Sequence, residues 1–492
     1  MLISCDLEPE SLYVVVHDLI RLTFPGSILV KGDNDKAEIN IQIKMLRYDG
    51  IIKLIGKVRE VNNTSQFDDE YSIEIGEDRK AINRRIRRFC FKLLSKHQNK
   101  PISSYGTLTG VKPVKMIHRF LDEEYSREAM KSILQKDRYL QTEKIDLLTE
   151  VAFNNRKYLL NKEMARKLVS IYIGIPYCPT RCYYCSFPSA VLKDYDQEIL
   201  PFLKTLLTEI KLIGNYLKSQ DIKVQTIYIG GGTPTILKDK DMSTLLETVN
   251  INLKSDQTKE ITVEAGRPDT LSLAKIQILK DGGVTRICIN PQTMNDKTLQ
   301  VIGRKHSVKE VINAVELARQ VGINQLSMDV IVGFPGEKEE EYAQTAESII
   351  KIKPENLTIH TLALKKGAKM AENDGRINME MRISRVEEGA KYFSNILRKA
   401  NYIPYYLYRQ KYMRGDMENI GFSQPGNICI YNIQMIEERQ SIIGLGGGGA
   451  SKFVKPDNWS LTSIYNPKDP KAYIKSMPDL LARKVDKLMG LN

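Results

Sequence analysis

The segment Tyr172-Ile-Gly-Ile-Pro-Tyr-Cys-Pro-Thr-Arg-Cys-Tyr-Tyr-Cys-Ser-Phe187 places Cys178, Cys182 and Cys185 on one short loop, directly after an apolar strand. Iron–sulfur clusters of the [4Fe–4S] type are usually held by four cysteines. A C-x3-C-x2-C triad can hold three irons of such a cube, which leaves the fourth iron open for a chelating small molecule. Zinc sites favour two separated C-x2-C pairs, and the chain has no second pair. The triad therefore predicts a [4Fe–4S] cluster, with a zinc knuckle or plain structural thiols as alternatives.

Around the triad, from about Ser170 onward, apolar strands alternate with helices. The strands are predicted at residues 171–175, 224–229, 260–265, 286–290, 325–332 and 356–364, and the helices at 194–217, 242–253, 271–280, 308–321 and 339–352. Strands that alternate with helices form a parallel sheet, and six such units make an incomplete (β/α)6 barrel. Ligands bind at the carboxyl ends of the strands in this architecture. The cysteine triad lies on the first of these loops.

Polar residues and glycines occur at the ends of several of these strands. The run Gly230-Gly-Gly-Thr-Pro234 ends the second strand and can expose backbone N–H groups to a ligand. Glu264, Gln292 and Asp329 stand at later strand ends, and Arg304 follows one of them. A carboxylate can hold ribose hydroxyls or an ammonium group, and an arginine can bind a carboxylate with two hydrogen bonds. Each residue alone could be a cap or an ion pair, but together they predict a binding site.

The triad and the glycine run resemble the radical SAM superfamily, which binds S-adenosylmethionine at the open iron. More narrowly, the order and spacing of the polar residues resemble the oxygen-independent coproporphyrinogen III oxidase family over roughly residues 170–365. This resemblance implies that Cys178, Cys182 and Cys185 are the cluster ligands and the catalytic centre. It also implies contacts to S-adenosylmethionine from Tyr172, Tyr184, Gly231, Gly232, Thr233, Glu264, Gln292, Arg304, Asp329 and Ala363.

Further segments are similar to the longer, HemZ-type branch of that family, the coproporphyrinogen dehydrogenases. They are the N-terminal extension, Tyr105-Gly-Thr-Leu-Thr-Gly110 and Glu264-Ala-Gly-Arg-Pro-Asp269. The run Gly444-Leu-Gly-Gly-Gly-Gly-Ala-Ser451 resembles the family's C-terminal glycine turn, with a flexible hairpin loop as the alternative. Two positions depart from the family's best-studied oxidases, which have His where this chain has Gly174 and Cys where it has Phe187. A haem-binding chaperone branch shares that Phe.

Together, pattern and resemblance predict an α/β chain of three parts. An N-terminal α+β module spans residues 1–165, an incomplete (β/α)6 radical SAM barrel spans 166–370, and a C-terminal α+β extension on the substrate side spans 371–492. The resemblance implies an oxidoreductase that converts propionates of the tetrapyrrole coproporphyrinogen III to vinyl groups, giving protoporphyrinogen IX in haem biosynthesis. It further implies an external electron donor such as flavodoxin or ferredoxin.

The N-terminal module carries most of the positive charge. Ile39–Met45 and Ile51–Val58 alternate like antiparallel strands, and Asp49-Gly50 between them is a strong hairpin turn. Apolar residues then recur at helical spacing from Arg79 to Lys96, and further helices are expected near 112–120 and 127–140. Between residues 79 and 121 there are 12 Lys and Arg and no Asp or Glu, which accounts for nearly all of the net charge of +13.

This basic segment has three interpretations: a solvated face, a guide for the carboxylates of a tetrapyrrole, or a surface for RNA, since a focused positive potential attracts polyanions. An RNA-modifying radical SAM enzyme is therefore one alternative function, although only Phe89, Phe91 and Tyr105 offer stacking platforms there. A haem-binding or haem-trafficking protein that retains the cluster is the other. Its candidate axial ligands are His118, His306 and His360.

Composition and the cysteines outside the triad indicate the class of protein and its cellular compartment. With 492 residues, 42% hydrophobic and 27% charged, the chain has the composition of a globular protein of more than one domain. No apolar run approaches the roughly 18 residues that a membrane span needs, and the first ten residues lack the pattern of a secretory signal. We therefore expect a cytoplasmic protein that makes no membrane contact and keeps its thiols reduced. The cysteines outside the triad are expected to be buried apolar residues: Cys5, Cys90, Cys288 and Cys429.

Overall fold

A computed structural model describes residues 1–61, 63–72, 77–185, 190–363, 379–410 and 417–490, with the backbone alone for 379–385. The chain forms two compact units, Met1–Thr149 and Glu150–Asn492, which we call the N-terminal unit and the C-terminal unit. The predicted boundary at 370/371 lies outside the described residues. The division into three parts therefore stays a prediction.

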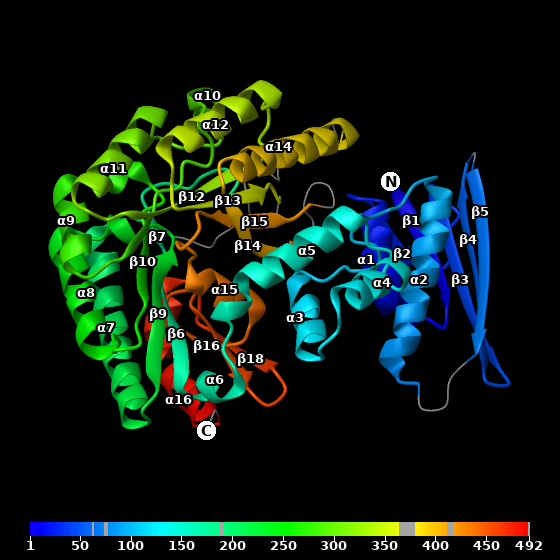
Figure 1. Cartoon of the computed structure of the whole chain (residues 1–492), viewed down its shortest axis with the longest axis horizontal. Helices are drawn as coiled ribbons and strands as arrows, with labels where there is room; N and C mark the ends of the chain where they lie inside the picture. Colours follow the sequence, from blue (N-terminus) through cyan, green and yellow to red (C-terminus); the bar gives the residue numbers. More distant parts are fainter. Residues whose placement is uncertain (62, 73–76, 186–189, 364–378, 411–416, 491–492) are drawn as a thin grey trace. The chain divides into compact units, whose positions relative to one another are not determined.

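The N-terminal unit contains a five-stranded sheet with the strand order β2-β1-β3-β4-β5 (Figure 1). Asp49 and Gly50, with φ of 44° and 76°, turn β3 into β4, and these two strands pair antiparallel along their whole length. The predicted hairpin is thus confirmed. The strand bounds are β1 Leu2–Glu8, β2 Ile28–Lys31, β3 Ile39–Tyr48, β4 Ile51–Glu60 and β5 Asn63–Ser72.

Helix α2 (Arg79–His97) confirms the predicted amphipathic helix. The Asp78 side chain caps it by accepting a hydrogen bond from the Ala81 N–H, and Phe89 and Leu93 are buried in the core under the sheet. A Cβ at Gly56 would lie 2.6 Å from Leu93, so this glycine lets the helix approach β4 closely. The other helices of this unit are α1 Leu12–Thr23, α3 Val114–Asp122 and α4 Arg127–Lys136, and α5 Thr142–Asn155 crosses the unit boundary.

The C-terminal unit contains an eleven-stranded sheet with the order β14-β15-β13-β12-β11-β10-β9-β6-β16-β17-β18. Its centre is the predicted parallel series, in which each strand pairs with the next. The sheet does not close on itself in the described part of the chain, so the predicted incomplete barrel is confirmed. The series consists of β6 Leu168–Ile175, β9 Lys223–Gly231, β10 Glu260–Glu264, β11 Arg286–Cys288, β12 Gln325–Val332 and β13 Asn356–Thr361.

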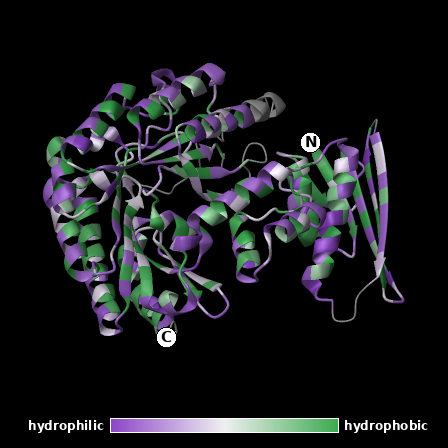
Figure 2. Ribbon diagram, viewed as in Figure 1, coloured by the Kyte–Doolittle hydropathy of each residue, from purple (hydrophilic) through white to green (hydrophobic). Residues whose placement is uncertain are grey.

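Helices cover the outside of this series, as Figure 1 shows for α7, α8, α9 and α11, and the strands beneath them are mostly apolar (Figure 2). All five predicted helices are present within a few residues of their expected ends. Their bounds are α7 Tyr195–Ser219, α8 Asp239–Asn252, α9 Leu273–Asp281, α11 Val308–Gln320 and α12 Glu339–Ile352, and the short α6 Lys162–Lys167 and α10 Asp296–Val301 accompany them.

The C-terminal residues extend this sheet at both edges, which sequence periodicity did not reveal. Strand β16 pairs parallel with β6, whereas β15 pairs antiparallel with β13. The added elements are α14 Met379–Lys399, β14 Ile403–Tyr408, β15 Asn419–Ser423, α15 Ile430–Glu437, β16 Ser441–Gly446, β17 Ala450–Lys455, β18 Ser460–Tyr465 and α16 Pro470–Met489.

A buried ion pair fastens the last helix to the barrel. Glu209 of α7 and Lys484 of α16 are fully buried and 2.6 Å apart. Glu209 also accepts hydrogen bonds from the Tyr473 hydroxyl at 2.6 Å and the Gly446 N–H at 2.9 Å, and Lys484 donates to the Gly444 carbonyl. Because every polar atom of this pair has a partner, its burial is compatible with a stable core.

Candidate active site

The three cysteines lie on the loop that follows β6, where the parallel strands end. Cys178 closes the two-residue strand β7 (Tyr177–Cys178), which pairs with β8 (Ala190–Val191). The Cys185 N–H donates to the Cys182 carbonyl at 3.2 Å, and the Tyr183 N–H donates to the Ile302 carbonyl at 3.0 Å. Cys182 is 9% exposed, and the other two cysteines are half-buried. The loop is thus held by its own backbone and by the segment after α10.

Two sulfurs of the cysteine triad receive hydrogen bonds from other strand ends. The Thr233 hydroxyl lies 3.5 Å from the Cys178 sulfur, and Nη1 of Arg267 lies 3.6 Å from the Cys182 sulfur. Both groups are donors, and a thiolate is a better acceptor than a thiol. These contacts therefore suit sulfurs that act as hydrogen-bond acceptors, as the sulfurs of metal-bound cysteines do.

The glycine run after β9 packs against the backbone that leads into Cys178. Gly231 has φ of 113°, and a Cβ at Gly232 would lie 2.4 Å from the Tyr177 carbonyl oxygen. The Gly232 N–H donates to Ile175 and the Thr233 N–H donates to Tyr177, both at 2.8 Å. Only glycine permits this approach, which brings the predicted cofactor residues Gly231, Gly232 and Thr233 beside the cysteine loop.

Glu264, at the end of β10, is bound to the neighbouring strand. It accepts a hydrogen bond from the Tyr228 hydroxyl at 2.8 Å and another from the Gly231 N–H at 3.1 Å. Burial raises the pKa of this carboxyl to about 7, against the lowering effect of these hydrogen bonds. Glu264 can therefore gain or lose a proton near neutral pH.

Gln292, which follows β11, meets Asp329 within β12. Gln292 has φ of 69°, and its N–H donates to the Asp329 carbonyl at 3.0 Å. Its side-chain Oε1 is buried and has no hydrogen-bond partner among the described residues. Asp329 Oδ1 lies 3.5 Å from Nε2 of His360 on β13, so this carboxyl group has a polar neighbour within the parallel sheet.

Arg304 joins three elements at the same edge of the sheet. Its Nη1 donates to the carbonyls of Gly266 at 2.6 Å and Asn290 at 3.0 Å, and its Nη2 donates to the Tyr184 hydroxyl at 3.0 Å. Arg304 thereby ties the ends of β10 and β11 to the cysteine loop. Ala363, the last predicted cofactor residue, follows β13 at a half-buried position.

Tyr172 begins a stack of aromatic rings inside the barrel. Its ring lies 6.2 Å from Tyr228 of β9 and 6.4 Å from Tyr431 of α15, and these two rings are 4.5 Å apart. Burial raises the pKa of Tyr228 and of Tyr431 well above the usual value, so both hydroxyls stay protonated. Sequence reasoning identified Tyr172 but missed Tyr228 and Tyr431, because nothing local in the sequence places Tyr431 beside the first strand.

The substitution of Gly174 for the histidine of the best-studied oxidases has a steric basis in this chain. A Cβ at Gly174 would lie 2.4 Å from the Gly447 carbonyl oxygen, and one at Gly447 would lie 2.5 Å from Pro176. The glycine turn after β16 therefore occupies the space that a side chain at position 174 would need. Phe187, the other departure, lies outside the described residues.

The residues at these strand ends fit an iron–sulfur cluster and a bound nucleoside-type cofactor. No three His, Cys, Asp or Glu side chains of the described residues converge on a single metal ion. A cube spreads its three ligands over three irons and does not need such convergence. Buried polar atoms without hydrogen-bond partners gather at this edge, namely Asn290 Oδ1, Gln292 Oε1 and Arg304 Nε. Buried polar groups normally have partners, so a ligand with donors and acceptors suits the site.

The remaining sequence candidates are mostly buried side chains. His118 and His306 are 1% and 3% exposed, and burial lowers the pKa of His306 to about 4. Cys5, Cys90, Cys288 and Cys429 are buried as predicted.

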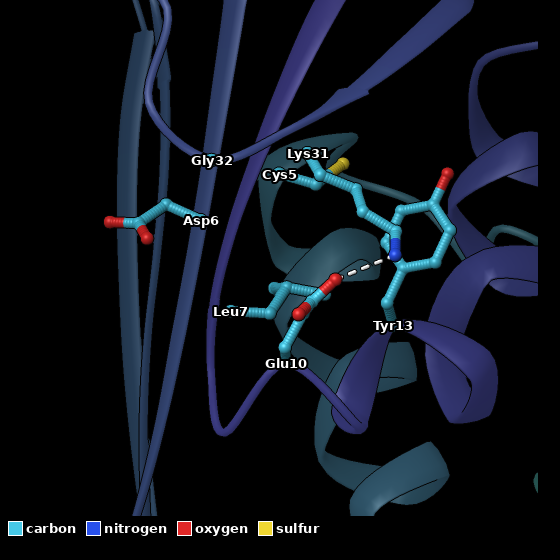
Figure 3. Close-up of a pocket in the computed structure, with 7 residues that line it drawn as sticks. All are labelled: Cys5, Asp6, Leu7, Glu10, Tyr13, Lys31 and Gly32. Carbon is cyan, nitrogen blue, oxygen red and sulfur yellow. Dashed lines mark hydrogen bonds and ion pairs between the residues drawn. The ribbon is translucent and has the colours of Figure 1, made fainter.

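A pocket of about 220 Å³ in the N-terminal unit is lined by Cys5 and by the exposed Glu10–Lys31 ion pair (Figure 3). Burial raises the pKa of Cys5 to about 11, so this thiol stays protonated.

Comparison with known proteins shows the family of the chain. The family model described as the radical SAM superfamily matches residues 172–349, from the first strand to α12. A Bacillus subtilis protein, the oxygen-independent coproporphyrinogen-III oxidase-like protein HemZ, is 36% identical over 95% of this chain and 93% of its own length. The chain belongs to this radical SAM family. Members of the superfamily use a [4Fe–4S] cluster and S-adenosylmethionine, which are therefore the cofactors of this chain.

Two further relatives of the radical SAM family carry different names. The haem chaperone HemW of Bacillus subtilis is 34% identical over 39% of this chain and 50% of its own length. The solved structure of Escherichia coli coproporphyrinogen III oxidase (HemN) aligns with a TM-score of 0.50 and 19% identity, covering 67% of this chain and 72% of that one. The latter shows the shared fold.

Among the described residues, no helix has both the length and the apolar character of a membrane span.

Proposed function

We propose that this protein is a radical SAM oxidoreductase that converts propionate side chains of coproporphyrinogen III to vinyl groups. Each conversion passes one hydrogen atom to the deoxyadenosyl group derived from S-adenosylmethionine and one electron to an external one-electron acceptor, and it releases one CO2; two rounds give protoporphyrinogen IX. The observation that carries the proposal is the similarity to the HemZ-named relative, because it runs through both units rather than through the barrel alone.

The chain's own residues support this chemistry in three ways. Cys178, Cys182 and Cys185 would hold the cluster, which supplies the electron that cleaves S-adenosylmethionine. The glycine run and the unpartnered Gln292 Oε1 would orient the cofactor at the strand ends. The aromatic stack that begins at Tyr172 fills the barrel interior beneath the site and keeps water out of it.

Anaerobic turnover tests the proposal. Reconstituted protein is incubated with S-adenosylmethionine, a reductant and coproporphyrinogen III, and the tetrapyrrole is analysed by mass spectrometry. Loss of one and then two CO2 units is expected. Cleavage of S-adenosylmethionine with the tetrapyrrole left unchanged would overturn the substrate assignment.

Haem binding is the second candidate function, favoured by the similarity to HemW. Of the three candidate axial ligands, only His360 is partly exposed, and its nitrogens face Asp329 at 3.5 Å and the Tyr408 hydroxyl at 3.2 Å. A bond to haem iron would displace one of these partners. Titration with haem should give a sharp Soret shift that His360→Ala removes if this function holds.

A further inference from the structure

We propose that Arg267 sets the reduction potential of the cluster by placing a buried positive charge against the Cys182 sulfur. Arg267 stands in the segment Glu264–Asp269, between β10 and α9, and is 3% exposed. This inference rests on the family's cluster and does not depend on which molecule the enzyme acts on.

The guanidinium of Arg267 is held in a fixed orientation. Its Nε and Nη2 face the Asp269 carboxylate at 3.1 and 3.4 Å, and Nη2 also donates to the Thr180 hydroxyl at 2.8 Å. Thr180 lies between the first two cysteines of the loop. The remaining nitrogen, Nη1, is thereby directed at the Cys182 sulfur, 3.6 Å away.

This contact acts on the charge of the cluster. Reduction takes one electron from an external one-electron donor and adds one negative charge to the cluster, with no proton transferred. A nearby buried cation stabilises the more negative state, and the interaction is strong because few water molecules screen it. Net charge and hydrogen bonds to the sulfurs are known controls of such potentials. Arg267 should therefore raise the potential and ease reduction.

Asp269 gives the inference a test of opposite sign. Its side chain is 27% exposed and partly neutralises Arg267, whose own side chain is 4% exposed. Removing the negative charge of Asp269 leaves the guanidinium uncompensated, so the potential should rise. A residue that only braced the loop would not make the two substitutions move the potential in opposite directions.

Redox titration of the reconstituted protein, followed by EPR without S-adenosylmethionine or tetrapyrrole, measures the effect. Arg267→Gln should lower the equilibrium constant for reduction about tenfold, a shift of about 59 mV to more negative potential for a one-electron couple. Arg267→Lys keeps the charge and should shift the potential by less than half as much. Asp269→Asn should shift it to more positive values.

Arg286→Gln is the matched control, because Arg286 is 4% exposed but stands at the start of β11, at the opposite end of the sheet. The reduction potential of the cluster in Arg286→Gln should equal that of the wild type. An unchanged potential in Arg267→Gln, or a shift of Asp269→Asn in the same direction, would overturn the proposal. If Arg267→Gln does not hold iron, the directions of the shifts in reduction potential in Arg267→Lys and Asp269→Asn still test the proposal. Failure of tetrapyrrole turnover would leave these potentials unaffected.

Discussion

Charge is handled differently in the two units of this protein. In the N-terminal unit, the cations of α2 lie at the surface and several pair with local carboxylates, as Arg88 does with Asp137 at 3.3 Å and Lys92 with Asp69 at 3.6 Å. In the C-terminal unit, polar groups at the strand ends are buried, and Gln292 Oε1 and Arg304 Nε lack a partner within the part of the chain that the structure describes. The conspicuous charge run is thus partly balanced within its own unit. The less conspicuous strand ends are where a ligand is needed.

The largest expected effect concerns the cysteine loop. Cys182→Ala should remove the iron and abolish cleavage of S-adenosylmethionine, because only two ligands would remain on the loop. Iron content and formation of 5′-deoxyadenosine measure this loss. Cys5→Ala, at a buried cysteine of the N-terminal unit, is the control and should keep both. A Cys182→Ala protein with full iron and full cleavage would end the assignment of the cluster to this loop.

The effect of burial can be compared on two ion pairs of equal length, one in each unit. Lys484–Glu209 is fully buried and Lys31–Glu10 is exposed, and both span 2.6 Å. Lys484→Met should lower the free energy of unfolding of the C-terminal unit by about 3–5 kcal/mol, because Glu209 would stay buried without its cation. Lys31→Met should cost much less, because water screens an exposed ion pair. Urea unfolding measures both, and equal costs would contradict the role assigned to burial.

Glu264 predicts a pH dependence of stability. Burial raises its pKa from 4.5 to about 7, so the folded protein binds this proton more tightly than the unfolded chain does. The resulting stabilisation is greatest below pH 4.5 and is lost as pH rises to 7, by up to about 3 kcal/mol. Glu264→Gln should flatten this decline in the free energy of unfolding, measured from pH 4.5 to 8. The exposed Glu340→Gln should leave the decline as in the wild type, and a decline unaltered by Glu264→Gln would contradict the prediction.

The smallest effect is expected on α2. We predict that replacing Arg84, Arg85, Arg87 and Arg88 with Ala raises the KM for coproporphyrinogen III several-fold, because positive charge attracts its four carboxylates. Cleavage of S-adenosylmethionine without substrate should be unchanged. Lys131→Ala, an exposed cation on α4, is the control. An unaltered KM would show that these arginines do not attract the substrate. Tight binding of bulk tRNA with a steep salt dependence would favour the RNA alternative.

Local patterns predicted the six barrel strands, their helices, the Asp49-Gly50 hairpin and α2, because periodicity reports which side of an element is buried. They did not predict that β16 pairs with β6, because local patterns carry no information on contacts between distant residues. The hydrogen bond between Ser170 and Gln440, for example, joins positions 270 residues apart. The same limit hid Tyr431 and the role of Arg267. The motif that contains Arg267 was visible, but its contact with Cys182 depends on how the end of β10 meets a loop 85 residues earlier.

The place of β16 also orders events during synthesis of the protein. Strand β6 carries the cysteine loop, yet its partner on one side, β16, is synthesised after every other strand of the parallel series. Until then β6 is an edge strand with open backbone groups, and the Gly447 carbonyl that packs on Gly174 is not yet in place. The cysteine loop therefore has its full support only once β16 has paired with β6, and a chain that ends before residue 441 presents a cysteine loop supported on one side only.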